Sequence, residues 1–422
     1  MTTRNTAGAS AGVESAPSWP VWPQASASSL ALLEEVLHSG RWAISGRYRG
    51  RPSFERRFAA AFARYVGTTH CVPTASGTAS LMTALEACGV GAGDEVVIPG
   101  LTWVANASAV AAMNAVPVPV DVREDTYTMD PDAVRSAIGP RTTAIVAVHL
   151  YSSLADLRAL QDLADRHGLV LIEDAAQAHG ARYLDRAAGS HGHAGTFSMQ
   201  TSKLLTSGEG GAVTTDRADV ARAVEHLRAD GRAYADAPTA VGAMELVESA
   251  EIMGSNRCLS EFQAAVLLDQ LTRLDEQNAT RLHNAARLDD RLKQLGLKPQ
   301  ETAVGTTLRT YYSYVVTLEE GLAADLDLDA VGAELTRRLG TPVGRCHRPL
   351  DINPLYRPSS RARFRRAGPE ILEGLAAYEL PIANSIHRRA LMLEHAALLG
   401  THDHMDAVAD AFAAVLDTAP RS

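Results

Sequence analysis

Two residues in this chain carry side chains that could act together on one ligand, a lysine and an aspartate. Lys203 closes the segment Thr-Phe-Ser-Met-Gln-Thr-Ser-Lys, and Asp174, 29 residues earlier, closes the run Leu-Val-Leu-Ile-Glu-Asp. A lysine amine can form a Schiff base with an aldehyde, and a carboxylate can hold a pyridine nitrogen in its protonated state. The pair therefore predicts a cofactor that has both groups, which is pyridoxal 5'-phosphate (PLP).

Few other amines compete for that role, because the chain has 3 lysines against 37 arginines. Lys293 and Lys298 lie in Arg-Leu-Lys-Gln-Leu-Gly-Leu-Lys, whose periodicity predicts the exposed face of a helix end. Asp174 has an alternative role, since an aspartate after a strand is often the N-cap of the next helix. The other possible role is to pair with a pyridinium, because a carboxylate at the end of an apolar strand is costly without a positively charged partner.

Further features could serve the same ligand. Residues 74–80 join a predicted strand to a predicted helix, where free backbone N–H groups can bind phosphate, although many such turns are plain connectors. Trp103 follows a strand end and could stack on a flat ring or fill the core. Gln177 lies one predicted helical turn beyond the aspartate, and Ser198 lies five residues before the lysine. His179 is close in sequence, but we expect a core histidine.

The elements that must position these residues follow from the hydrophobic pattern. Short β-branched apolar runs alternate with helix-length stretches, which is typical of a buried, mainly parallel sheet in an α/β domain. We expect strands at 70–73, 95–99, 116–121, 143–149 and 169–174, helices at 54–62 and 78–87, and a strand pair at 195–198 and 211–215 around the lysine loop. Ligands of open α/β sheets bind at the carboxyl ends of the strands, where the candidate residues lie.

Composition and hydrophobic periodicity divide the chain into three predicted parts. Residues 1–28 are rich in Ala, Ser, Thr and Pro and predict a mobile N-terminal arm. Residues 29–275 form the α/β domain, with a first helix at 28–37 and a Gly- and Arg-rich loop at 41–51 that could cover a site. Residues 276–422 fit a smaller α+β domain, with a strand at 311–317 and an irregular stretch at 342–368.

Composition excludes several classes of protein. The 422 residues are 46% hydrophobic and 21% charged, enough for large cores, yet no apolar run reaches membrane-spanning length and the N-terminus lacks a signal-peptide core. We therefore expect a cytoplasmic enzyme. The 4 cysteines lack the spacing of a metal site or a disulfide framework, so we expect reduced thiols and no metal. A net charge of -9 argues against nucleic acid as a partner.

From about residue 38 onward the chain resembles the DegT/DnrJ/EryC1/StrS family of PLP-dependent aminotransferases. The segments that carry the resemblance are Gly40-Arg-Trp-Ala-Ile-Ser-Gly, Ser76-Gly-Thr, Glu95-Val-Val-Ile-Pro-Gly-Leu-Thr-Trp, Glu173-Asp-Ala-Ala-Gln-Ala-His-Gly, Lys203-Leu-Leu-Thr-Ser-Gly-Glu-Gly-Gly-Ala-Val and Gly254-Ser-Asn-Arg-Cys-Leu-Ser-Glu-Phe. The resemblance implies the aspartate aminotransferase-like PLP fold type I, with a mainly parallel seven-stranded sheet in the large domain and a smaller α+β C-terminal domain.

The same resemblance implies roles for the candidate residues. Lys203 would form the internal aldimine and move the proton, and Asp174 would hold the pyridine nitrogen. Gln177 would contact the hydroxyl side of the cofactor, and Trp103 would stack on its ring. The residues expected to hold the phosphate are Ser76, Gly77, Thr78 and Ser198. Asn256 would reach the phosphate of a neighbouring subunit, because family members are homodimers with active sites at the interface.

Within the family, residues 40–46, 101–103 and 259–271 look most like enzymes that aminate a keto-cyclitol for aminoglycoside antibiotics. The implied reaction moves an amino group from an amino acid, L-glutamine, to a ketone on a keto-cyclitol or keto-sugar. One alternative is an aminodehydratase of the 3-amino-5-hydroxybenzoate synthase type. Another is a non-catalytic protein of the same fold that serves as a partner for another enzyme.

The sequence departs from the family pattern where substrate specificity would be set. The segment Pro342-Val-Gly-Arg-Cys-His-Arg-Pro-Leu-Asp has Arg345 and Asp351 near positions where we expect His. Arg345 could bind an anionic substituent of the substrate or pair with Asp351. We assign His149, Arg345 and His347 to the substrate side of the site.

Overall fold

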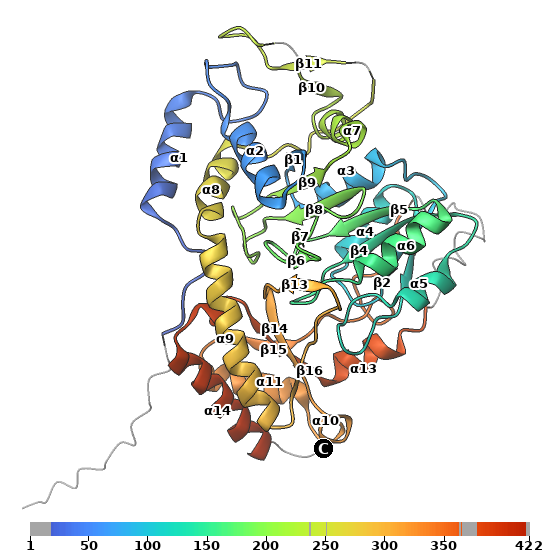
Figure 1. Ribbon diagram of the computed structural model, residues 1–422, viewed down its shortest axis with the longest axis vertical. Coiled ribbons are helices and arrows are strands. Elements are labelled where there is room, and N and C mark those ends of the chain that lie inside the picture. Colours follow the sequence, from blue (N-terminus) through green and yellow to red (C-terminus); the bar gives the residue numbers. More distant parts are fainter. Residues whose placement is uncertain (1–17, 236–237, 250, 363, 365–377, 419–422) are drawn as a thin grey trace, which may run out of the picture.

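A computed structural model describes residues 18–235, 238–249, 251–362, 364 and 378–418 (Figure 1). The α-helices in these ranges are α1 (Ala27–Ser39), α2 (Phe54–Val66), α3 (Gly77–Ala87), α4 (Ala105–Ala112), α5 (Pro131–Ala137), α6 (Leu157–His167), α7 (Ala218–Arg228), α8 (Glu261–Leu271), α9 (Leu274–Gln294), α10 (Glu320–Ala324), α11 (Leu328–Leu339), α13 (Pro381–Arg389) and α14 (His402–Thr418). The strands are β1 (His70–Thr74), β2 (Glu95–Pro99), β3 (Val116–Val120), β4 (Thr142–Val148), β5 (Val170–Asp174), β6 (Arg182–Tyr183), β7 (Arg186–Ala187), β8 (Ala194–Ser198), β9 (Gly211–Thr215), β10 (Arg232–Tyr234), β11 (Leu246–Glu248), β12 (Lys298–Pro299), β13 (Thr306–Leu308), β14 (Ser313–Thr317), β15 (Val343–Arg345) and β16 (Ala390–Glu394).

A seven-stranded sheet in the order β1-β9-β8-β5-β4-β2-β3 forms the centre of the molecule. The pairs β5-β8, β4-β5, β2-β4 and β2-β3 are parallel, whereas β9 runs antiparallel to both of its neighbours. The predicted α/β class and mainly parallel sheet are confirmed. The predicted strand pair around the lysine is also confirmed, because β8 and β9 pair directly on either side of that loop.

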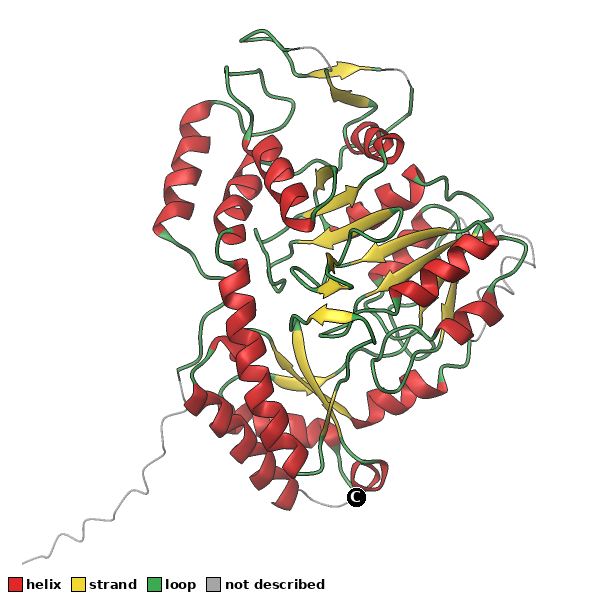
Figure 2. Ribbon diagram, in the orientation of Figure 1, coloured by secondary structure: helices red, strands yellow, loops and turns green. Residues whose placement is uncertain are grey.

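Helices cover both faces of this sheet, as Figure 2 shows. One buried cluster packs α2, α6 and α8 on one face, and a second cluster packs α3, α4 and α7 on the other. Most of the strand residues between them are buried, which explains why the runs are apolar at successive positions rather than alternating.

A second, four-stranded antiparallel sheet in the order β12-β14-β16-β15 lies at the other end of the molecule (Figure 1). It shares a third buried cluster with α9, α11 and α14. The C-terminal residues do not all belong to this second body, because Leu350, Ala383 and Ile386 pack in the core of the large sheet. A boundary near residue 275 therefore places the two sheets in different parts of the chain, but some residues after it pack against the large sheet.

The expected mobile arm is wrong for residues 18–26, and residues 1–17 lie outside the described part of the chain. Trp19 Nε1 donates to the carbonyl of Leu339 at 2.6 Å, and Trp22 stacks edge-on against His395. Ser26 caps α1 and donates to Asp269 at 2.8 Å. Local composition predicted disorder here because tryptophan contacts with distant elements leave no periodic signal.

Three smaller expectations also have outcomes. Lys293 is exposed on α9 as predicted, but Lys298 lies on strand β12 rather than on a helix. The irregular stretch contains the short strand β15, and its residues 363 and 365–368 lie outside the described ranges. Within the described part of the chain, the helices are too short or too polar to cross a bilayer.

Candidate active site

A cavity of about 430 Å³ opens at the carboxyl ends of the large sheet's strands. It is lined after β1 by Ser76, Gly77 and Thr78, after β2 by Thr102, Trp103 and Asn106, after β5 by Asp174 and Gln177, after β8 by Ser198, Gln200, Ser202, Lys203 and Glu209, and from the second body by Tyr312 and His347. Nearly all residues predicted for the cofactor therefore meet in one place. A larger cavity of about 780 Å³ lies elsewhere, between α2 and a side formed by Ala235, Pro238, Thr239 and Glu245, and contains none of them.

Lys203 reaches the cavity from the loop between β8 and β9. Its Nζ lies 4.3 Å from the centre of the Tyr312 ring, and its backbone N–H donates to the Gln200 carbonyl at 2.8 Å. Two distant side chains hold the residues just before it, since Trp22 Nε1 donates to the Thr201 carbonyl at 3.0 Å and His395 Nε2 to the Ser202 carbonyl at 2.9 Å. The loop thus presents the amine from a backbone that is fixed at both preceding residues.

Asp174 lies at the end of β5 and is buried. Its Oδ2 accepts a hydrogen bond from Asn106 Nδ2 at 2.9 Å, and its Oδ1 accepts one from the backbone N–H of Ala176 at 3.0 Å. The N-cap alternative is wrong because turns, not a helix, follow the strand. Both donors hold the carboxylate in place at the edge of the cavity.

Asn106 is a functional candidate that sequence reasoning missed. It is buried on the first turn of α4, where its amide also donates to Thr102 Oγ1 at 3.0 Å. Its Oδ1 is buried without a hydrogen-bond partner among the described residues. The only sequence signal was its position three residues after Trp103, which without the fold is an ordinary helix position.

The N-terminus of α3 forms a cradle of small residues beside β8. Ser76 caps the helix by accepting the Ala79 N–H at 3.1 Å, and Gly77 faces Ser198 so closely that a Cβ on Gly77 would lie 2.5 Å from the Ser198 Cβ. Thr78 follows on the same turn. Free backbone N–H groups and the positive end of the helix dipole make this cradle fit a phosphate.

Trp103 and His347 form a wall of the cavity, with ring centres 5.9 Å apart. Trp103 is 53% exposed, so the alternative that it fills the core is wrong. Burial, with the charges of Lys203 and His387, lowers the pKa of His347 to about 4. The imidazole is therefore neutral at neutral pH, and its Nε2 has no partner among the described residues.

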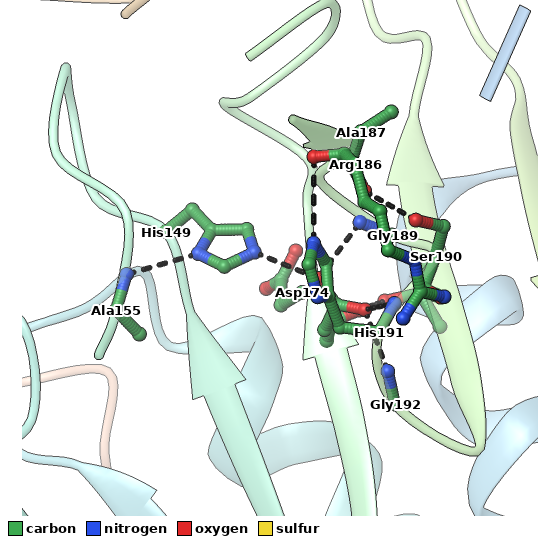
Figure 3. Close-up of polar contacts among 12 residues, drawn as sticks. His149, Ala155, Asp174, Arg186, Ala187, Gly189, Ser190, His191 and Gly192 are labelled. Carbon is green, nitrogen blue, oxygen red and sulfur yellow. Dashed lines mark hydrogen bonds and ion pairs between the residues drawn. The ribbon is translucent and has the colours of Figure 1, made fainter. Parts of the chain in front are cut away.

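His149 was predicted on the substrate side, but it does not line the cavity. Figure 3 shows that both of its ring nitrogens make polar contacts, one of them with Ala155. Its Nδ1 accepts the Ala155 N–H at 3.1 Å, so its Nε2 carries the proton that it donates to Glu173 at 3.2 Å. Glu173 is fully buried and also accepts the backbone N–H groups of Gly189, His191 and Gly192. Because both ring nitrogens are used, His149 supports the strand that carries Asp174 and does not bind substrate.

Arg345 also lies outside the cavity. It pairs with Asp329 at 3.2 Å and donates to the His387 carbonyl at 2.6 Å, while Asp351 accepts from Asn384 at 2.6 Å. The expected Arg345–Asp351 pair is therefore wrong, and so is an anion site at Arg345 in this cavity. His179, expected in the core, is fully buried beside Phe197.

Asn256 and the loop at 41–51 do not line the cavity of their own chain. Asn256 is exposed and its Oδ1 accepts the Cys258 N–H at 3.3 Å. The loop instead runs beside residues 242–244, where the backbone N–H of Tyr48 donates to the Ala243 carbonyl at 2.8 Å. Tyr48 also lines the larger cavity.

A lysine, a buried carboxylate and a helix N-terminus around one cavity, on a mainly parallel seven-stranded sheet, define an enzyme of PLP fold type I. The chain matches the DegT/DnrJ/EryC1/StrS aminotransferase family over residues 23–413, and it belongs to that family. It is therefore an aminotransferase, and the alternative of a non-catalytic partner protein is set aside.

Two relatives and one solved structure show which members of the family this chain is similar to. The chain is 58% identical to the L-glutamine:2-deoxy-scyllo-inosose aminotransferase of Streptomyces fradiae over 400 residues, which covers 94% of each chain. It is 56% identical to the L-glutamine:scyllo-inosose aminotransferase of Streptomyces griseus over 401 residues, again 94% of each. Among solved structures, 3-amino-5-hydroxybenzoic acid synthase superposes with a TM-score of 0.81 at 31% identity, covering 96% of this chain and 100% of that one.

Proposed function

We propose that this aminotransferase moves an amino group from L-glutamine to a ketone on a polyhydroxylated six-membered ring of the scyllo-inosose type. The observation that carries the proposal is the relation to enzymes of that name at 56–58% identity over 94% of the chain. Enzymes so named make aminocyclitols, so we place the reaction in aminoglycoside-type biosynthesis. We expect it to act in the cytoplasm.

The cofactor in this proposal is PLP, as in other aminotransferases of the family. When bound, PLP supplies an aldehyde that joins amines and a protonated pyridine ring that accepts electrons. The residues present fit it: Asp174 offers a carboxylate to the ring nitrogen, and Trp103 offers a flat face. The N–H groups at Gly77 and Thr78, with the Ser198 hydroxyl, offer donors to the phosphate.

Lys203 is the base in this cavity, because it is the lysine that lines it. Its amine lies against the face of the Tyr312 ring, which keeps one side of the amine away from water. From there it takes a proton from the carbon that bears the donor's nitrogen and returns one to the carbon of the ketone. Asp174, held by two hydrogen bonds, would pair with the ring nitrogen of the cofactor.

The acceptor would lie against the polar outer part of the cavity, where neutral side chains predominate. Gln200, Ser202, Tyr312 and His347 offer amide, hydroxyl and imidazole groups, which match the hydroxyls of a cyclitol. Ser202 Oγ lies 3.1 Å from the Tyr312 hydroxyl, so these two present a shared donor and acceptor pair. The absence of Arg345 from the lining disfavours an acidic ring as substrate.

An aminodehydratase of the 3-amino-5-hydroxybenzoate synthase type is the second candidate, because that enzyme superposes closely. Sequence identity weighs against it, at 31% compared with 58% for the aminocyclitol enzyme. The two reactions differ in mass balance, since only the dehydratase eliminates water from its substrate, whereas transamination exchanges an amino group for a carbonyl oxygen between two molecules.

We also propose a homodimer with Asn256 at the partner's phosphate. Several large apolar side chains are exposed, namely Trp42, Val241, Met244, Val247 and Met253, and Met253 is 94% exposed. A β-bridge between Arg47 and Met244 joins two of the segments that carry them, and exposed apolar groups of this kind fit an interface between copies of the chain. A monomer in light scattering at micromolar concentration would contradict this part of the proposal.

The test is mass spectrometry of products after PLP-loaded protein is incubated with L-glutamine and scyllo-inosose or its 2-deoxy form. A new inosamine should form with wild-type protein and with Lys298→Ala, whose lysine is exposed and pairs with Glu319, but not with Lys203→Ala. If glutamine is converted but no inosamine forms, the protein would still be an aminotransferase, and the proposed acceptor ketone would be wrong. A dehydrated aromatic product from an aminoshikimate-type substrate would favour the second candidate.

A further inference from the structure

Tyr151 does not line the cavity, yet it contacts three residues that do. Its backbone N–H donates to Gln177 Oε1 at 2.6 Å, and its carbonyl accepts the Tyr312 N–H at 3.0 Å. Its hydroxyl accepts the backbone N–H of His347 at 2.7 Å, and the two rings lie 5.3 Å apart. One buried residue thus connects the cofactor side of the cavity, the wall beside Lys203 and the segment after β15.

The backbone around Tyr151 is fixed by its neighbours. Tyr151 has a left-handed φ of 59°, inside a turn closed by two 3.0 Å hydrogen bonds between Leu150 and Ser153. Gln300 donates to the Leu150 carbonyl and accepts from Ser152, and His149 is held by Glu173. A non-glycine residue in this backbone region persists only where its surroundings over-determine it.

His347, by contrast, follows the short strand β15 and precedes the turns at 350–356. Its own backbone N–H is bonded to the Tyr151 hydroxyl, and its side chain Nε2 is the unpartnered buried nitrogen of the cavity. The direction of that nitrogen therefore depends on where the Tyr151 hydroxyl holds the peptide of His347.

We propose that the Tyr151 hydroxyl is a positioning group that aims His347 at the acceptor substrate and so sets the affinity for the ketone. The backbone of Tyr151 holds Gln177 and Tyr312 independently of that hydroxyl. The identity of the ketone rests on the proposed function, whereas the anchoring of His347 rests on this geometry alone.

The test is Tyr151→Phe, which deletes the hydroxyl and leaves the ring and the hydrogen bonds of the Tyr151 backbone in place. The matched control is Tyr127→Phe, because Tyr127 is equally buried, has a φ of 61°, and directs its hydroxyl to Thr317 away from the cavity. A neutral hydrogen bond is worth about 1 kcal/mol, so the KM for the ketone should rise about fivefold in Tyr151→Phe alone. The kcat and the affinity for PLP should change less than about twofold, as expected for a contact that acts only on acceptor binding.

Two further measurements distinguish a specific effect on the position of His347 from a general loss of stability around the cavity. In a double-mutant cycle, Tyr151→Phe should add no further rise in KM when His347 is already alanine. Hydrogen exchange of the peptide that contains His347 should be faster in Tyr151→Phe than in Tyr127→Phe, with PLP absent.

An unchanged KM, an equal rise in the His347→Ala background, or an unchanged exchange rate would each overturn the inference. Failure of the proposed function has a different signature, in which wild-type protein yields no amine from any cyclitol ketone. The exchange measurement would still decide whether Tyr151 anchors the segment.

Discussion

Replacing Asn106 by alanine should weaken PLP binding without unfolding the protein. The Asn106 amide is the side-chain donor to Asp174 Oδ2, at 2.9 Å, and both residues are buried. A hydrogen bond to a charged acceptor contributes about 1.5 to 3 kcal/mol, and each 1.4 kcal/mol is a factor of ten in an equilibrium constant. If the bond serves to aim the carboxylate at the pyridine nitrogen, the dissociation constant for PLP should rise roughly ten- to a hundredfold.

The assay is titration of apoprotein with PLP, followed by the change in tryptophan fluorescence, with thermal unfolding of the apoprotein measured in parallel. Asn284→Ala is the matched control, because Asn284 is as buried as Asn106 and donates two hydrogen bonds, to the carbonyls of Leu398 and Gly400, far from the cavity. The control should lower the unfolding temperature and leave PLP affinity unchanged. Equal losses of PLP affinity in both variants, or none in Asn106→Ala, would refute the role assigned to this contact.

Two other perturbations test the surroundings of the site. Gly77→Ala should reduce affinity for PLP at least tenfold, because the added Cβ would lie 2.5 Å from the Ser198 Cβ, whereas Gly91→Ala, with nothing within 4 Å of its Cβ, should bind PLP like wild type. Glu173→Gln should lower the free energy of unfolding at pH 7 by about 3 kcal/mol, since it replaces a buried acceptor of four hydrogen bonds. Burial alone would raise the pKa of Glu173, but the hydrogen bond from His149 and the backbone donors hold it below its usual 4.5. The carboxylate therefore stabilises the fold above pH 4.5, and denaturant titrations should show the difference from Glu173→Gln shrinking as the pH falls below that value; a constant difference would contradict this.

The sequence predicted most of the cofactor side of the site because each of its residues stands at the end of a recognisable strand. Carboxyl ends of parallel strands meet at one edge, so Ser76, Trp103, Asp174 and Ser198 had to converge once the strands were identified. The resemblance to the family then assigned roles that spacing alone left open. The same logic failed for His149, which directly follows a strand but whose ring turns back toward Glu173.

The residues on the substrate side of the cavity could not be predicted from the positions of strand ends. His347 and Tyr312 come from the second body and enter the cavity only through packing between the two sheets, and Arg345, two residues from His347, points to Asp329 instead. Neighbours in an irregular segment share no periodicity from which side-chain direction could be inferred. The N-terminal tryptophans were missed for a related reason, since their partners lie more than 170 residues away.

What the sequence by itself determined is the chemistry and the scaffold: a rare lysine, an aspartate at a strand end, and apolar runs that can only be buried strands. What only the tertiary structure decided is which polar side chains face the cavity and which support it. Asn106 and Tyr151 form hydrogen bonds to Asp174 and His347, which line the cavity, while His149 and Arg345 form bonds elsewhere. The physical reason is that strand burial is a local, repeated property of the chain, whereas the direction of one side chain depends on partners brought together from distant segments.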